Sequence, residues 1–194
     1  MGGVKAALQA NPNTHVKKTD RPTNWMSNIR KMEETNGAMG LSESLNSDLT
    51  SKESNNIDVH MMRTTEYGAI AILSASGYGN PKTLQNSSIK TTTGNKTGVY
   101  FTGNSWEWNA GGLQGSIFGG VNTKYYDAYT GSSSSAKVGD AFGCSGWHSA
   151  SSSYWVDGGY PCFKRDGGGL FSFKYGNASD DYGGRGVGVC GAGL

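Results

Sequence analysis

Three cysteines and three histidines are among the side chains of this sequence that could act as nucleophiles, bases or metal ligands. The cysteines, Cys144, Cys162 and Cys190, lack the C-x-x-C spacing typical of zinc and redox sites. Their odd number excludes a full disulfide framework, and if one bond forms we expect it between Cys162 and Cys190. Cys144 and His148 could form a nucleophile–base pair, but we interpret their spacing as chance proximity within a serine-rich loop.

The other two histidines give no better catalytic set. His15 lies in a polar N-terminal segment, and His60 lies beside Met61 on a predicted strand. We interpret His60 as a hydrogen-bonded core histidine, with a general base as the alternative. The sequence also lacks a G-x-S-x-G elbow, a P-loop and an H-E-x-x-H helix. The residues themselves therefore indicate no reaction.

Composition bounds the class of protein. The chain has 194 residues, 17 Lys and Arg against 15 Asp and Glu, and a net charge of +2, so it lacks the basic surface typical of nucleic-acid binding. No apolar run is long enough to span a membrane. With 31 glycines and 11% aromatic residues, the composition is typical of a globular, loop-rich domain.

The first part of the chain carries the helix signals. Residues 1–22 are expected to be a flexible tail or linker, and residues 23–194 a single domain. A helix over 23–34 is predicted from the apolar spacing of Trp25, Ile29 and Met32, with a cap at Thr23 or Asn24. Residues 57–62 are predicted to be a strand, and 63–74 a second helix.

An aromatic hairpin is expected in the middle of the chain. Residues 99–101 are predicted to be a strand and Gly103-Asn104 a tight turn, followed by a strand with Trp106 and Trp108 on one face. We expect Trp106 to be buried against the 63–74 helix, because a strand tryptophan would fill the space beside an Ala/Ile stripe. Glu107 should then face the other way.

These segments also resemble a known family. Gly98-Val-Tyr and Gly103-Asn-Ser-Trp-Glu-Trp108 resemble the G-L-Y-D-M-x-G-N-V-W-E-W signature of the formylglycine-generating-enzyme (sulfatase-modifying factor) family. Met62-Arg-Thr-Thr-Glu-Tyr67 is similar to the helix that precedes this signature, and residues 163–173 resemble the R-G-G-S-x-x-x-G-x-F-x-F strands. Gly184-Arg-Gly-Val-Gly-Val189 replaces the family's terminal G-F-R-V.

The resemblance covers residues 57–194 and implies an α+β fold: a C-type lectin-like domain with two early helices and a twisted antiparallel sheet with long Gly/Ser-rich loops. The relatives include variable proteins of diversity-generating retroelements, found on phage tails and cell surfaces, and surface-displayed adhesin-like proteins. An extracellular location, on a cell surface or virion, is implied. The family's enzymes bind copper through paired thiolates, whereas no cysteine lies between Cys162 and Cys190. We therefore expect no enzymatic activity.

The expected function is recognition of a protein or glycan through the segment from Tyr154 to Tyr182. Two alternatives are an oxidase of the formylglycine-generating type and a structural pilin or capsid decoration protein. The oligomeric state stays open. No cofactor is expected, although calcium could bind at Asn177, Asp180 and Asp181. The segment combines aromatic rings with short polar groups, as binding surfaces do. The expected ligand-binding residues are Tyr154, Trp155, Asp157, Tyr160, Phe163, Tyr175, Asn177, Ser179, Asp180, Asp181 and Tyr182.

Overall fold

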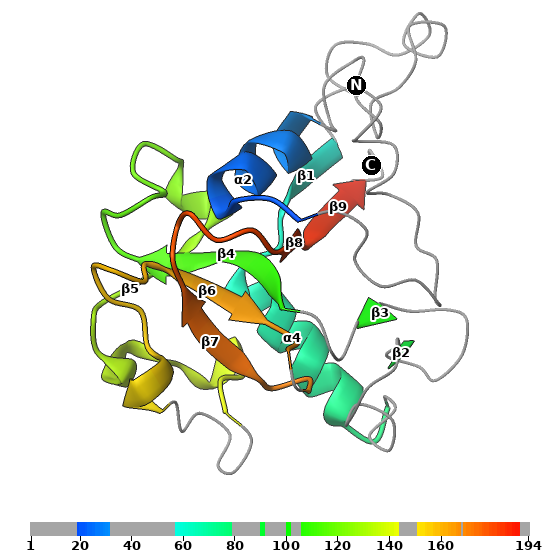
Figure 1. Cartoon of the computed structure of the whole chain (residues 1–194). Coiled ribbons are helices and arrows are strands. Elements are labelled where there is room, and N and C mark those ends of the chain that lie inside the picture. Colours follow the sequence, from blue (N-terminus) through cyan, green and yellow to red (C-terminus); the bar gives the residue numbers. More distant parts are fainter. Residues whose placement is uncertain are drawn as a thin grey trace, which may run out of the picture.

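A computed structural model describes residues 19–31, 57–78, 90–91, 100–101, 106–143, 151–167 and 169–190. Within these residues the fold is α+β, with two α-helices arranged around a mixed sheet (Figure 1). The helices are α2 (Pro22–Arg30) and α4 (Thr64–Ala75). Short 3₁₀ turns are η3 (Thr123–Tyr125), η4 (Ser133–Ser135), η5 (Val138–Asp140) and η6 (Ser152–Tyr154). The strands are β1 (Ile57–Met61), β2 (Lys90–Thr91), β3 (Tyr100–Phe101), β4 (Glu107–Leu113), β5 (Asp127–Tyr129), β6 (Cys162–Arg165), β7 (Phe173–Gly176), β8 (Gly183–Gly184) and β9 (Gly186–Cys190).

Strand β4 is the centre of the main sheet, whose order is β5-β4-β6-β7, with β8 also paired to β4. Strands β6 and β7 continue from it in antiparallel pairs, whereas β5 and β8 run parallel to β4. The sheet is therefore mixed, and the expectation of an antiparallel sheet is wrong in this respect. Both parallel strands reach β4 through connections longer than a hairpin turn, which permits the parallel direction.

A second, smaller sheet joins strands from distant parts of the sequence. Strand β1 pairs antiparallel with β9, with Ile57 opposite Cys190 and Met61 opposite Gly186. Two backbone hydrogen bonds connect this pair to β4: Ala110 N–H donates to Met62 O at 2.8 Å, and Arg185 N–H donates to Trp108 O at 3.2 Å. The strand predicted at 57–62 is confirmed, and it lies against β4 (Figure 1).

Both helices lie where the apolar pattern predicts them. Helix α4 is confirmed, and its N-terminus is capped by Glu66, whose Oε2 accepts the N–H of Arg63 at 2.8 Å. Helix α2 begins at Pro22, one residue before the predicted cap, because a proline at the first position already has helical φ. The predicted end of that helix lies outside the described residues.

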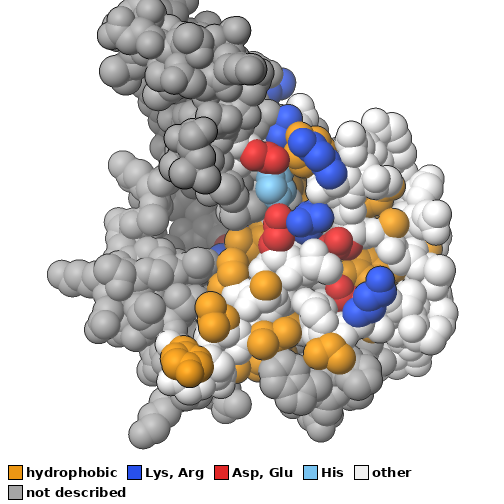
Figure 2. Space-filling view, turned by 180° about the vertical axis from the view of Figure 1, so that it is seen from behind, with side chains coloured by type: hydrophobic (Ala, Val, Ile, Leu, Met, Phe, Trp, Pro, Cys, Tyr) orange, Lys and Arg blue, Asp and Glu red, His pale blue; other side chains and the backbone are white. Residues whose placement is uncertain are grey.

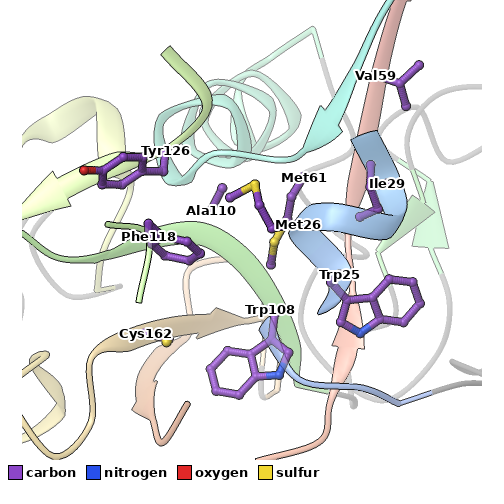
Figure 3. Close-up of a cluster of buried hydrophobic side chains, with 10 residues drawn as sticks. All are labelled: Trp25, Met26, Ile29, Val59, Met61, Trp108, Ala110, Phe118, Tyr126 and Cys162. Carbon is purple, nitrogen blue, oxygen red and sulfur yellow. The ribbon is translucent and has the colours of Figure 1, made fainter. Parts of the chain in front are cut away.

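Hydrophobic side chains fill both faces of the main sheet. On one face Trp108 and Cys162 pack with Met26, Ile29 and Met61 from α2 and β1 (Figure 3). On the other face Phe163 packs within a separate aromatic cluster, which contains Tyr129, Phe142, Trp155, Val156, Phe163 and Phe173. Neighbouring residues of β6 thus serve opposite cores, as strand alternation requires. Gly176 is needed beside the first core, because a Cβ there would collide with the ring of Trp108.

The central hairpin prediction is wrong in its pairing. Strand β3 pairs with β2, whereas β4 pairs with β5, β6 and β8. The turn residues Gly103 and Asn104 lie outside the described residues. Trp106 is half-buried, whereas a buried ring was expected, and it lies against Gly167. Trp108 instead is the fully buried ring, because its position within β4 directs it into the core below α2 and β1.

The residues just before α2 pair with the C-terminal part of the chain. Asp20 and Tyr182 exchange two backbone hydrogen bonds of 2.9 and 3.1 Å, so the segment before α2 already packs on the domain. Residues 1–18 lie outside the described part of the chain. Within the described ranges, no helix has the length and apolar character needed to cross a membrane.

Candidate functional site

The structure divides the expected ligand-binding segment by burial. Trp155 and Phe163 are only 4% and 0% exposed, and both belong to the aromatic core cluster. The indole N–H of Trp155 donates to Thr130 O at 2.8 Å, which fixes this ring in place. The expectation that these two rings face a ligand is therefore wrong. Pairing of β6 with β7 directs Phe163 inward, and the 3₁₀ turn η6 leads Trp155 over it.

Three tyrosines of the same segment lie at the surface, and we call Tyr154, Tyr160 and Tyr175 the tyrosine surface. Tyr154 and Tyr160 are 46% and 43% exposed, and Tyr175 on β7 is half-buried. The rings of Tyr160 and Tyr175 stack with centroids 4.6 Å apart and planes tilted by 42°. The stacked rings therefore leave aromatic surface open to solvent. This surface lies beside the aromatic core cluster, against which Tyr175 of β7 also packs.

Asp157 positions Tyr160 within this surface. Its Oδ1 accepts the N–H groups of Gly159 and Tyr160 at 2.8 and 2.9 Å, closing a turn. The N–H of Asp157 in turn donates to Tyr160 O at 3.2 Å. The backbone that carries the exposed ring is therefore ordered by its own hydrogen bonds.

The expected calcium residues are engaged in a turn. Asn177 Oδ1 accepts the N–H and hydroxyl of Ser179 at 3.0 and 2.8 Å, and Asp180 Oδ2 accepts the N–H of Asn177 at 3.2 Å. Asp181 is exposed. In the part of the chain that the structure describes, no three Asp, Glu, His or Cys side chains converge on a common point.

Tyr182 lies apart from the tyrosine surface. Its ring packs edge-on against Trp108 with centroids 5.2 Å apart, and Lys164 Nζ lies 3.9 Å from its centroid. Its carbonyl also accepts the indole N–H of Trp25 at 2.9 Å. The residue thus joins α2 to the sheet.

A second set of functional groups surrounds His60, and we call Asp58, His60 and Glu66 with Arg30 and Arg63 the histidine cluster. Figure 2 shows charged side chains of both signs around the pale blue histidine. His60 Nδ1 lies 2.9 Å from Asp58 Oδ1, and Nε2 lies 2.9 Å from Glu66 Oε1. An ionised carboxylate can only accept hydrogen bonds, so this arrangement favours the imidazolium form, in which both ring nitrogens donate.

The environment of this cluster shifts its pKa values in a consistent way. The hydrogen bond to Glu66 raises the pKa of His60, and burial opposes this effect only in part. Burial works to raise the pKa of Glu66, but hydrogen bonds from His60 and Arg63 outweigh it and lower the pKa to about 2. The interpretation of His60 as a hydrogen-bonded core residue fits this geometry.

A third set is enclosed in the protein, and we call Glu107, Asp166 and Arg185 the buried acid–arginine cluster. Arg185 Nη2 pairs with Glu107 Oε2, and it lies 3.2 Å from Asp166 Oδ2. Burial, together with the negative charge of Asp166, raises the pKa of Glu107 to about 7 despite Arg185. Asp166 adopts a left-handed backbone conformation with φ of 71°. The contact of its carboxylate with Arg185 helps to stabilise this conformation.

Sequence reasoning missed both ionic clusters as units. Alternation along β1 could have placed Asp58 and His60 on one face, and Glu66 at the third position of α4 was a signal for a capping contact. No local pattern joins Glu107 to Arg185, because they meet only when β8 and the residues after it return to β4.

The cysteine prediction is corrected by the structure. Cys162 is a free, buried cysteine on β6, so the expected bond to Cys190 is wrong. The two residues belong to different sheets, with Cys162 opposite Gly112 and Cys190 opposite Ile57. Burial raises the pKa of the Cys162 thiol to about 12. Cys144 and His148 lie outside the described residues.

Comparison of the chain with family models, with curated proteins and with solved structures finds no match in any of the three.

Proposed function

We propose that this chain is a non-enzymatic recognition domain with a C-type lectin-like fold, of the kind found in retroelement-diversified and surface-displayed adhesin-like proteins. Support comes from the order of its parts: helix α4 precedes the Trp-Glu-Trp sequence, which leads into β4, and the Arg-Asp-Gly segment follows in β6 and the turn after it. The domain would act outside the cell, on a cell surface or virion. Its ligand would be a protein or a glycan.

The stacked pair of Tyr160 and Tyr175 is the observation that carries this proposal. An exposed ring that loses little freedom on binding contributes more to affinity than a mobile side chain does. Tyr160 meets this condition, because the Asp157 turn fixes its backbone and Tyr175 supports its ring at 4.6 Å. Such clustered aromatic rings are typical binding hot spots.

The state of Cys162 argues against the copper oxidase alternative. Copper sites in that family need two thiolates close together, and thiolate is the ligand form. Cys162 is fully buried, and its raised pKa of about 12 opposes ionisation. The residues after Arg165-Asp-Gly-Gly-Gly, where the resemblance would require a cysteine, are Leu170, Phe171 and Ser172.

The proposal is tested with the double variant Tyr160→Ser/Tyr175→Ser. Wild type and variant are screened on an immobilised glycan array and against a displayed peptide library, and affinities are then measured for each selected ligand. We expect a loss of at least about tenfold, since one hot-spot ring contributes about 2 kcal/mol or more. The matched control is Tyr78→Ser, which removes a tyrosine that is 94% exposed beyond the end of α4.

Three results would count against this assignment. Full binding by the double variant would show that the tyrosine surface is not the site. An equal loss in Tyr78→Ser would show a nonspecific effect of removing aromatic area. Failure of wild type to select any glycan or peptide would contradict the recognition function itself.

A further inference from the structure

Asp157 brings a negative charge to the tyrosine surface. Its Oδ1 accepts the N–H groups of Gly159 and Tyr160, whereas its second carboxylate oxygen takes part in neither hydrogen bond. Asp157 is exposed, and the ion pairs formed by the described residues use other acids. Within this part of the chain, no direct contact with a cation therefore neutralises the carboxylate, which lies three residues before an exposed ring.

The ring of Tyr160 is accessible beside this charge. Tyr175 covers one side of the ring with centroids 4.6 Å apart, so the area that makes Tyr160 43% exposed lies on the other side and at the edge. Gly158 and Gly159 separate the ring from Asp157, and a Cβ at Gly158 would meet nothing within 4 Å. One ligand group can therefore approach the ring and the carboxylate together.

Both parts of this site attract positive charge. The face of a tyrosine ring attracts cations, because its π electrons make the face negative. Within the tyrosine surface this contact already occurs once, since Lys174 Nζ lies 6.0 Å from the ring centroid of Tyr154. Among the described residues, no cation lies over Tyr160 or Tyr175 in this way. The aromatic pair and the carboxylate together are complementary to a cationic group.

We propose that the tyrosine surface recognises an exposed arginine side chain of a protein ligand. This inference rests on the proposed recognition function and narrows its ligand from a protein or glycan to a protein. The guanidinium stacks on Tyr160 and donates to the second oxygen of Asp157, because a planar, weakly hydrated cation can make both contacts at once. Asp157 repels an acidic glycan, and a neutral glycan leaves its charge without a partner.

The test selects binders of the wild-type chain from a displayed library of random peptides. We expect the selected peptides to share an arginine. Replacing this arginine by citrulline, which is neutral and has nearly the same shape, should weaken binding at least about tenfold. A loss of this size would show that the positive charge of the ligand, rather than the bulk of its side chain, is recognised.

The variant Asp157→Asn tests the carboxylate without breaking the turn. The Oδ1 of asparagine can still accept the N–H groups of Gly159 and Tyr160, while the charge is removed. We expect a loss of at least about tenfold for the arginine peptides and little change for their citrulline forms. Added salt should weaken the binding of arginine peptides more in the wild type than in the variant.

The matched control is Asp20→Asn, which removes the same charge elsewhere. Asp20 Oδ1 likewise accepts a neighbouring N–H, that of Arg21 at 2.8 Å, and the residue pairs with Tyr182, apart from the tyrosine surface. Binding of the arginine peptides should be unchanged in this variant. An equal loss in Asp20→Asn and Asp157→Asn would show an effect of net charge alone and would overturn the inference.

The remaining outcomes separate this inference from the recognition function. Selected peptides without a shared arginine, citrulline forms that bind equally well, or full binding by Asp157→Asn would overturn the inference and leave recognition standing. Selection of glycans but no peptides from parallel screens would do the same. If the wild type selects neither, the recognition function fails and this inference fails with it.

Discussion

The histidine cluster and the buried acid–arginine cluster combine the same kinds of side chains under different solvent access. In the first, the side chains of Asp58 and Arg30 are 43% and 30% exposed. In the second, those of Arg185 and Asp166 are only 10% and 1% exposed. Water can replace a lost partner in the histidine cluster but reaches little of the buried acid–arginine cluster. The cost of breaking an ion pair therefore depends on burial more than on distance.

The two clusters also hold their protons differently. His60 is kept charged by two carboxylates, and Glu66 is kept ionised by His60 and Arg63. Glu107 instead retains its proton up to a pH of about 7, because burial and Asp166 outweigh its attraction to Arg185. The histidine cluster thus favours the ionised form of every member. In the buried acid–arginine cluster two acids share a single arginine, and one of them retains its proton.

The largest effect is expected from Arg185→Met. This change leaves Glu107 and Asp166 buried without their arginine, and removing one partner of a buried pair costs about 3–5 kcal/mol. Urea unfolding monitored by circular dichroism measures the loss. An effect below about 1 kcal/mol at pH 7 would mean that water or protonation compensates the acids, and the two clusters would then not differ as described.

The next effect concerns the pH dependence caused by Glu107. Its pKa is raised from 4.5 to about 7 in the folded protein, so folding favours the protonated form. This contribution to stability is complete below pH 4.5 and is lost as the pH rises through about 7, a change on the order of 3 kcal/mol. Glu107→Gln should remove this slope from urea unfolding series. If the stability of the wild type rose with pH over this window in parallel with that of Glu107→Gln, the prediction would be contradicted.

His60 should produce a smaller effect in a different pH range. Its pKa is raised above 6.5, so its contribution is complete below pH 6.5 and is lost as the pH rises through the folded pKa. An NMR titration of the imidazole C–H signals should give a midpoint above 6.5, and Glu66→Gln should lower it. An unshifted midpoint in wild type would show that the two carboxylates do not hold the proton.

The smallest effect is expected from Arg63→Gln in the histidine cluster. Arg63 Nη2 pairs with Glu66 Oε1 at 3.1 Å, but both side chains are partly exposed and three residues apart on or beside α4. Such pairs contribute about 0.2–0.5 kcal/mol. Thermal unfolding at low and high salt measures the change, and a loss as large as that of Arg185→Met would erase the distinction between the clusters.

What the sequence could predict follows from local periodicity. The strand of His60 and the helix of Glu66 are confirmed because apolar spacing and capping residues act within a few positions. The burial of Trp155 and Phe163 escaped prediction, because glycine spacing hides a core that forms only when β6 and β7 pair and η6 folds over them. The prediction of the central hairpin failed for the same reason, because the pairing of strands depends on segments that are far apart in the sequence.

The pairing of β1 with β9 has a consequence for how the domain folds. Ile57 and Cys190 meet only after nearly all of the described chain has been traversed, so their contact closes a very long loop. Loop closure of this kind costs chain entropy before any hydrogen bond is gained, and folding slows as the mean sequence separation of contacts grows. Until β9 arrives, β1 keeps a bare hydrogen-bonding edge. During synthesis that edge can pair with strands of other molecules. The nascent chain depends on chaperones or on rapid folding to avoid this intermolecular pairing.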